Sequence, residues 1–337
     1  MLRVIYGGSP AASAKSLELI LKDSAMSKDA DGEEYKIVGV LTNPPAAQGR
    51  HKELIPTEVE HYVRIWNEAR GDNIAVLTPE HIAAPEREQI AALKPDVFVC
   101  FAYGHIVGPK FFSLFRFGGI NLHPSLLPKY RGATPVNACI LNQDTETGFS
   151  IQQMTQEIDE GDIFFQQRTG LTGTETAEQL LNNAALYGGI SMTNILREIA
   201  RENRLPDSYK QTGLPSYCSH IRKEDGHINW KDSALKIDAQ IRAYTPWPGT
   251  YSYSGGQQLR IIKANAASKV AIQDSSVPQN TQAVPGTVLD YNKQRGILIQ
   301  TGDGVLIATE LQWQSKKAMD YKSFMNGTKN FIGTILE

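Results

Sequence analysis

The stretch Leu2-Arg3-Val4-Ile5-Tyr6-Gly7-Gly8-Ser9-Pro10 combines a short apolar run with a glycine turn. Residues 11–22 follow with apolar side chains at helical spacing, and Tyr35–Leu41 is a second apolar run. A buried strand, a tight turn, a helix and another strand are typical of a parallel sheet covered by helices. We take this unit as the start of the fold.

The alternation of strands and helices continues to residue 123. It predicts helices at 57–69, 85–93 and 109–116, and strands at 74–77, 97–101 and 119–123. Strands that alternate with helices in this way indicate an α/β fold. We therefore predict a Rossmann-like domain with a mostly parallel sheet.

Beyond residue 200 the pattern changes. Residues 203–216 are polar, contain prolines and lack periodicity, which predicts a linker. The remainder predicts one helix at 233–243 and short strands at 249–253, 259–262, 286–289, 296–300 and 304–308. Closely spaced short strands favour a small β-barrel that resembles the oligonucleotide-binding (OB) fold. We therefore divide the chain into a catalytic domain (1–202), a linker (203–216) and a C-terminal OB-like barrel domain (217–337).

Composition excludes several protein classes. The chain has 337 residues, enough for two domains, and no apolar stretch approaches the roughly 20 residues that a membrane span needs. Met1-Leu2-Arg3 runs directly into the first strand, so we expect no targeting peptide. The 3 cysteines are widely spaced, which indicates neither a disulfide framework nor a zinc site. A cytoplasmic location is expected.

The charge is unevenly distributed along the chain. The formal net charge is −2, yet residues 216–337 hold 14 basic and 10 acidic side chains, against 20 and 26 in the rest. This asymmetry permits an anionic partner on the C-terminal part and does not require one. An ordinary solvated surface is equally compatible with it.

The turn Gly7-Gly8-Ser9-Pro10 lies where a nucleotide-binding turn would lie, but it is not the dinucleotide fingerprint. The third glycine is missing, and Thr42-Asn43-Pro44-Pro45 after the second strand offers no carboxylate for a ribose. A bound nicotinamide or flavin is therefore not expected. The glycines instead permit a tight turn and the close approach of a substrate.

The residues most suited to chemistry lie between 121 and 167. Asn121 and His123 are two positions apart on a strand, so both side chains project from one face at the end where such sheets bind ligands. An acidic cluster follows around Gly161; its members are Glu157, Asp159, Glu160 and Asp162. An amide, an imidazole and a carboxylate together suit proton-coupled acyl transfer. Spacing alone leaves open a second interpretation, in which His123 caps a strand and the acids are solvated.

Four motifs in this order resemble the folate-dependent formyltransferases. They are Asn121–Pro128, Tyr130–Gly132, Thr145–Gly148 and Asp159–Asp162. The resemblance implies a catalytic trio of Asn121, His123 and Asp159, with Asp162 ranked second. It also implies 10-formyltetrahydrofolate as co-substrate and no metal. The folate site is then expected at Ser125, Leu126, Leu127 and Pro128.

The C-terminal half is similar to that of the family members that act on methionyl-tRNA. The similar segments are 223–230, 241–249 and 316–319, and the resemblance covers nearly the whole chain. Residues 42–56 resemble the loop by which those members reach the tRNA, where Arg50 and Lys52 are expected to contact phosphates. This loop is less basic than usual, and Tyr6–Pro10 departs mildly from the family's usual turn.

The implied reaction is transfer of a formyl group from 10-formyltetrahydrofolate to the amino group of methionine on initiator methionyl-tRNA, which serves translation initiation. We expect a monomer with no membrane partner. A 10-formyltetrahydrofolate hydrolase and a sugar-amine formyltransferase that share the catalytic domain remain alternatives, as does a tRNA-binding relative without catalysis.

Overall fold

The computed structural model describes residues 1–30, 34–48, 53–269 and 282–337. The chain forms two compact units. Unit 1 comprises Met1–Pro135, Thr147–Thr169 and Leu180–Cys218. Unit 2 comprises Val136–Glu146, Gly170–Gln179 and Ser219–Glu337. The division into catalytic domain, linker and barrel domain stays a prediction.

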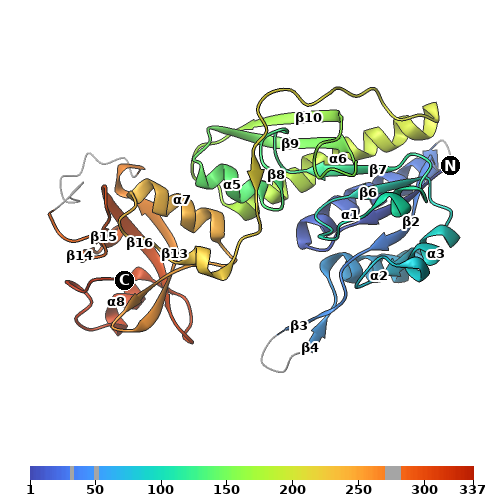
Figure 1. Ribbon diagram of the computed structural model, residues 1–337. Helices are drawn as coiled ribbons and strands as arrows, with labels where there is room; N and C mark the ends of the chain where they lie inside the picture. Colours follow the sequence, from blue (N-terminus) through green and yellow to red (C-terminus); the bar gives the residue numbers. More distant parts are fainter. Residues whose placement is uncertain (31–33, 49–52, 270–281) are drawn as a thin grey trace. The chain divides into compact units, whose positions relative to one another are not determined.

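The core of unit 1 is a sheet of 7 strands in the order β10-β9-β7-β6-β1-β2-β5 (Figure 1). The pairs β1·β2, β1·β6, β2·β5 and β6·β7 are parallel, whereas β7·β9 is antiparallel. The mostly parallel sheet is thereby confirmed. The strands are β1 (Leu2–Gly7), β2 (Tyr35–Leu41), β5 (Ala75–Leu77), β6 (Val97–Cys100), β7 (Gly119–His123), β9 (Glu146–Gln153) and β10 (Ile163–Gly170).

Helices cover both faces of this sheet. The helices are α1 (Ala11–Ala30), α2 (Glu58–Arg70), α3 (Ala84–Ala92), α4 (Pro109–Phe112) and α6 (Ala177–Glu202). In β1, Val4 and Tyr6 belong to the core formed with α1, α2 and α6, and Ile5 belongs to the core formed with α3 and α4. The period of two along a strand sends alternate side chains to opposite faces, so an apolar strand that is buried on both faces suits the centre of the sheet.

Two predicted helices differ in length from the observed ones. The helix expected to end at residue 22 continues to Ala30 because its next polar residues find partners outside the helix. Asp23 pairs with Arg197 at 2.7 Å, and the Ser24 hydroxyl donates to the Tyr35 carbonyl at 2.7 Å. The helix expected over 109–116 ends after one turn, at Phe112.

Two short strand pairs and an isolated bridge complete this part of the chain. The hairpin of β3 (Ala46–Gln48) and β4 (Glu53–Ile55) stands apart from the large sheet (Figure 1). β8 (Arg131–Gly132) pairs in parallel with β11 (Tyr217–Cys218), and Ile163 forms an isolated antiparallel bridge with Tyr209. Within unit 1, the segment predicted as a linker (203–216) is hydrogen-bonded to Ile163 through Tyr209 and to Arg131 through Ser216.

Unit 2 is built on an antiparallel sheet in the order β12-β13-β16-β15-β14, with β17 paired to β16. Its strands are β12 (Thr250–Ser254), β13 (Gln257–Ala266), β14 (Val288–Asn292), β15 (Gly296–Gln300), β16 (Val305–Trp313) and β17 (Met319–Asp320). The helices in this unit are α5 (Pro135–Leu141), α7 (Ala234–Tyr244), α8 (Tyr321–Gly327) and the 3₁₀ turns Lys223–Gly226 and Ala267–Lys269. The α/β fold class with a second, β-rich domain is confirmed.

The core of unit 2 lies between this sheet and its helices. Ser233 caps α7 by accepting from the Lys236 backbone N–H, and Ile237 and Ile241 then pack against the sheet.

Among the described helices of the whole chain, none is long and apolar enough to cross a membrane.

Candidate active site

The site is built on one face of β7 and β9, near the end of the parallel strands. Asn121 pairs with Gln152 across the two strands, and His123 pairs with Ser150. Directly opposed residues of antiparallel strands project to the same face. The sequence placed Asn121 and His123 together, and the fold adds two polar side chains beside them.

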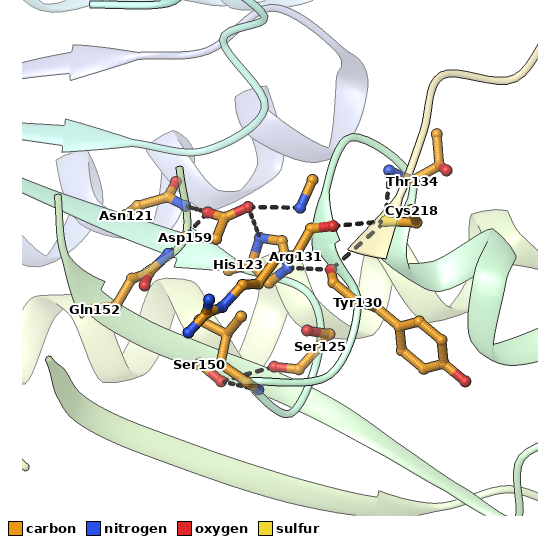
Figure 2. Close-up of polar contacts among 12 residues, drawn as sticks. Asn121, His123, Ser125, Tyr130, Arg131, Thr134, Ser150, Gln152, Asp159 and Cys218 are labelled. Carbon is orange, nitrogen blue, oxygen red and sulfur yellow. Dashed lines mark hydrogen bonds and ion pairs between the residues drawn. The ribbon is translucent and has the colours of Figure 1, made fainter. Parts of the chain in front are cut away.

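The Asp159 carboxylate joins the amide of Asn121 and the imidazole of His123 (Figure 2). Its Oδ1 accepts from Asn121 Nδ2 at 3.3 Å and from Gln152 Nε2 at 2.8 Å. Its Oδ2 accepts from the Gly132 backbone N–H at 2.8 Å and lies 3.4 Å from His123 Nδ1. The carboxylate side chain is only 8% exposed, so these four partners stand in for water.

The backbone around Asp159 is shaped for this role. Asp159 has φ +58°, a left-handed conformation, and Gly132 has φ +109°. A Cβ on Gly132 would lie 2.3 Å from the Cys218 carbonyl oxygen, and one on Gly161 would lie 1.7 Å from that of Gln153. Only glycine permits these close approaches, which bring the Gly132 N–H to the carboxylate.

His123 is surrounded by acceptors. Its Nε2 lies 2.9 Å from the Tyr130 carbonyl oxygen, and its Nδ1 faces Asp159. A carbonyl and a carboxylate only accept, so the ring satisfies both when each nitrogen carries a hydrogen. Both ring nitrogens of His123 therefore face acceptors, an arrangement that suits a protonated ring.

Two cysteines lie near this ion pair. Burial is the main cause that raises the pKa of the Cys100 thiol to about 12, and the negative charge of Asp159 contributes to this rise. Burial also raises the pKa of Cys218, whose Sγ lies 3.5 Å from the Tyr130 carbonyl oxygen. Both groups are therefore thiols at neutral pH, and neither adds a charge to the site.

Of the acidic cluster, Asp159 alone contacts both Asn121 and His123 among the described residues. Asp162 forms an ion pair with Lys210 at 3.0 Å, and Glu160 forms one with Arg131 at 2.7 Å. The geometry thus supports the choice of Asp159 over Asp162, although the catalytic roles stay predictions.

The loop expected to bind folate lies directly after His123. Ser125, Leu126, Leu127 and Pro128 are all buried. Ser150 holds this loop, because its hydroxyl donates to the Ser125 carbonyl at 2.7 Å and accepts from the Leu127 N–H at 3.1 Å. The loop is therefore fixed against β9, and its contact with folate stays a prediction.

Arg50 and Lys52, expected to contact tRNA, lie outside the described residues. The strands on either side of them, β3 and β4, are described. In β4, Leu54 is 72% exposed and Ile55 is 41% exposed.

Two residues at the same edge of the sheet each have a buried polar atom without a hydrogen-bond partner among the described residues. They are Tyr103, which follows β6 and has the unpaired hydroxyl, and Asn43, which follows β2 and has the unpaired side-chain oxygen. Buried polar atoms are normally paired in folded proteins, so an unpaired one at a ligand-binding edge suits a polar ligand. Among the described residues, no group of three or more His, Cys, Asp or Glu side chains is arranged to hold a metal.

Sequence reasoning missed two side chains around Asp159, Gln152 and Gln211. It included Arg131 in a motif but did not predict that Arg131 contacts this group. The alternation of buried Phe149 and Ile151 with polar Ser150 and Gln152 was the available signal for a strand with one polar face. Gln211 lies in the predicted linker, where no periodic pattern indicates a neighbour.

Comparison with known proteins gives the chain its family. Residues 13–194 match the formyl transferase family, and residues 220–329 match the C-terminal domain of formyl transferases. This chain belongs to the formyl transferase family. The methionyl-tRNA formyltransferase of Treponema denticola is 38% identical over 334 residues, with 98% of each chain covered. That of Treponema pallidum is 37% identical over 332 residues, with 97% of each chain covered.

Solved structures give this formyl transferase its fold relatives. An N-formyltransferase from Helicobacter canadensis, crystallised with folinic acid and dTDP-3-aminofucose, has a TM-score of 0.61 at 22% identity, over 91% of this chain and 99% of the other. The methionyl-tRNA formyltransferase from Clostridium thermocellum has a TM-score of 0.54 at 18% identity, over 80% of this chain and 95% of the other. At these identities the likeness concerns the fold.

Proposed function

We propose that this formyl transferase moves the formyl group of 10-formyltetrahydrofolate to the α-amino group of methionine esterified to initiator tRNA. The observation that carries the proposal is the contact of Asp159 with both Asn121, by a hydrogen bond, and His123, as an ion pair, at the edge of a formyl transferase fold. The relatives at 37–38% identity, named methionyl-tRNA formyltransferases, support the choice of acceptor.

The folate binds at the carboxyl edge of β7, β6 and β2 in this proposal. The buried loop Ser125–Pro128 shapes one side. The unpaired Tyr103 hydroxyl and Asn43 oxygen offer polar contacts to a pterin-like ring. The residues present therefore fit the polar ring of the folate, whose N10 nitrogen would carry the formyl group to be transferred.

Asn121 and His123 stabilise the oxyanion that develops on the formyl group. One hydrogen of the Asn121 amide is bound to Asp159, which leaves the second for the oxyanion. The His123 Nε2–H, held by the Tyr130 carbonyl, turns to the stronger, charged acceptor as it forms. Asp159 keeps the imidazole charged and oriented.

Asp159 also has to avoid trapping the attacking amine as an ammonium ion. Both of its oxygens already accept from two donors each. An ammonium would have to displace one of these buried contacts, so the saturated carboxylate leaves the neutral, nucleophilic amine favoured. The proton lost by the amine then leaves toward the folate nitrogen through His123 or water.

In this proposal the tRNA binds to Arg50 and Lys52 and to basic side chains of the C-terminal part, where basic residues outnumber acidic ones. The protein acts as a cytoplasmic monomer in this proposal. Phosphate contacts release counterions, so the affinity for charged tRNA is expected to fall as salt rises, by about one power of salt per phosphate contact. An affinity that does not change with salt would count against the tRNA interface.

The deciding experiment measures formyl transfer from 10-formyltetrahydrofolate to methionine-charged initiator tRNA. Methionine-charged elongator tRNA, a nucleotide-linked amino sugar and a reaction without acceptor are run beside it. We expect transfer to the initiator alone. Folate consumption without acceptor would indicate a hydrolase, transfer to the sugar would indicate a sugar-amine enzyme, and binding without turnover would indicate a non-catalytic relative.

A further inference from the structure

Gln211 connects the segment predicted as a linker to the loop that carries Asp159. Its Nε2 lies 2.8 Å from the Asp159 carbonyl oxygen and 2.8 Å from that of Gly161. It also lies 3.2 Å from the side-chain oxygen of Gln152. One amide thus contacts the backbone on both sides of residue 160 and a neighbouring side chain.

The orientation of this amide is fixed by its neighbours. The Gln211 Oε1 accepts from Arg131 Nε at 3.2 Å and from Arg131 Nη2 at 2.9 Å. A guanidinium only donates, and the three groups around Nε2 only accept. Reversing the amide would turn every one of these contacts into a repulsion, so the observed orientation is the favoured one.

Arg131 is itself held in place. Its side chain is 11% exposed, and its Nη1 pairs with Glu160 at 2.7 Å. The same Nη1 donates to the Tyr217 hydroxyl at 3.1 Å, and the guanidinium lies 5.8 Å from the Tyr217 ring centroid. Arg131 therefore presents a rigid fork of donors to Gln211.

Gln152 links Gln211 to the Asp159 carboxylate by hydrogen bonds. It is 1% exposed, its Oε1 accepts from Gln211, and its Nε2 donates to Asp159 Oδ1 at 2.8 Å. That bond is shorter than the one from Asn121 to the same oxygen, at 3.3 Å. Gln152 on β9 also lies directly opposite Asn121 on β7, so the strand pairing fixes its position.

We propose that Gln211 and Gln152 are positioning residues for formyl transfer, which hold the Asp159 backbone and carboxylate in the geometry that keeps His123 charged. The proposal rests on the proposed reaction. Neither amide contacts the reacting atoms. Gln211 fixes the loop whose left-handed residue is Asp159, and Gln152 stabilises the ionised carboxylate with a charge-assisted hydrogen bond.

The first test replaces each amide with an apolar side chain of similar length, as Gln152→Met and Gln211→Met. We expect kcat for formyl transfer to fall by about tenfold or more in each, the loss typical of a hydrogen bond to a charged group. The KM for 10-formyltetrahydrofolate should stay within about twofold. The matched control is Gln156→Met, an exposed glutamine on the same loop, which should keep the wild-type rate.

The second test separates positioning from mere packing. In Gln152→Glu the introduced carboxyl lies against Asp159, and the two share a proton at low pH. The protonated carboxyl donates as the amide did, so activity relative to wild type should rise as pH falls and be lost as pH rises. A loss that is equal at every pH would overturn the proposal.

The outcomes distinguish this inference from the proposed function. If the wild type does not transfer formyl to charged tRNA, the proposed function fails before any variant is compared. If the wild type is active and Gln152→Met and Gln211→Met match it, the positioning role is wrong. Should Gln152→Met not fold, as judged by thermal melting, the isosteric Gln152→Glu and its pH profile decide.

Discussion

Two buried carboxylates of unit 1, Asp159 and Glu60, have opposite surroundings. Their side chains are 8% and 5% exposed. Asp159 receives hydrogen bonds or an ion pair on both oxygens from residues of three separate segments. Glu60 is held through Oε1 by Arg64, one helical turn away, and its Oε2 is buried with no partner among the residues that the structure describes.

The two carboxylates are buried to a similar extent, so the difference between them lies in the origin of their partners. Glu60 lies in the first turn of α2, where the helix dipole favours a negative charge, and Arg64 is largely exposed. Local helix geometry explains such a residue. No local geometry explains four donors converging on Asp159, since they are brought together only by the fold. A carboxylate that receives donors from several distant segments therefore indicates a functional site, whereas burial of a carboxylate alone does not.

The largest expected effect comes from Asp159→Asn. The amide cannot balance the imidazolium, and its N–H₂ group would face other donors, so formyl transfer should fall by about 10³. Steady-state rates with charged tRNA and thermal melting check this. Glu60→Gln is the matched control, and equal losses in both variants would remove the distinction between the two carboxylates.

The next effect in size is that of His123→Ala. Without the ring, the oxyanion loses a donor, and the rate should fall by about 10² while tRNA affinity stays nearly unchanged. Rates and filter-binding affinities are compared with His61→Ala, which removes an exposed ring on α2. A variant that keeps most of its activity would take His123 out of the mechanism.

The sequence predicted those residues of the site whose positions follow from short-range patterns. Asn121 and His123 share a face because of the two-residue period of β7, and the family motif supplied Asp159. The strand β9 was not predicted, so Gln152 was missed. Gln211 could not be found, because the hydrogen bonds of an irregular segment depend on where the tertiary fold places it.

The fold was predicted to the same extent. The apolar runs of β1, β2, β6 and β7 gave the parallel core because they are buried on both faces. The helix α1 was expected to stop at residue 22, since the polar residues beyond it have no apolar period. Its continuation rests on contacts of Asp23 and Ser24 with residues distant in sequence.

A third, smaller effect is expected from Glu60→Gln itself. The change removes a buried charge with one unpaired oxygen, and it weakens a contact with an exposed arginine. These contributions oppose each other, so the free energy of unfolding should change by less than about 1 kcal/mol. Urea unfolding measures it. A loss of several times this amount would mean that the Glu60 charge has partners as strong as those of Asp159.

The smallest effect concerns the Cys100 thiol, whose pKa is raised to about 12, mainly by burial and in part by the Asp159 charge. A thiolate is an anion, so removing the neighbouring charge in Asp159→Asn lowers the pKa of Cys100 and raises its thiolate fraction at a given pH. Alkylation of Cys100 by iodoacetamide at pH 9, followed by mass spectrometry, should therefore be slow in the wild type and slightly faster in Asp159→Asn. Glu60→Gln should leave the rate unchanged, because Glu60 is not among the groups that act on this thiol. Equal alkylation in the wild type and in both variants would contradict an effect of the Asp159 charge on the Cys100 thiol.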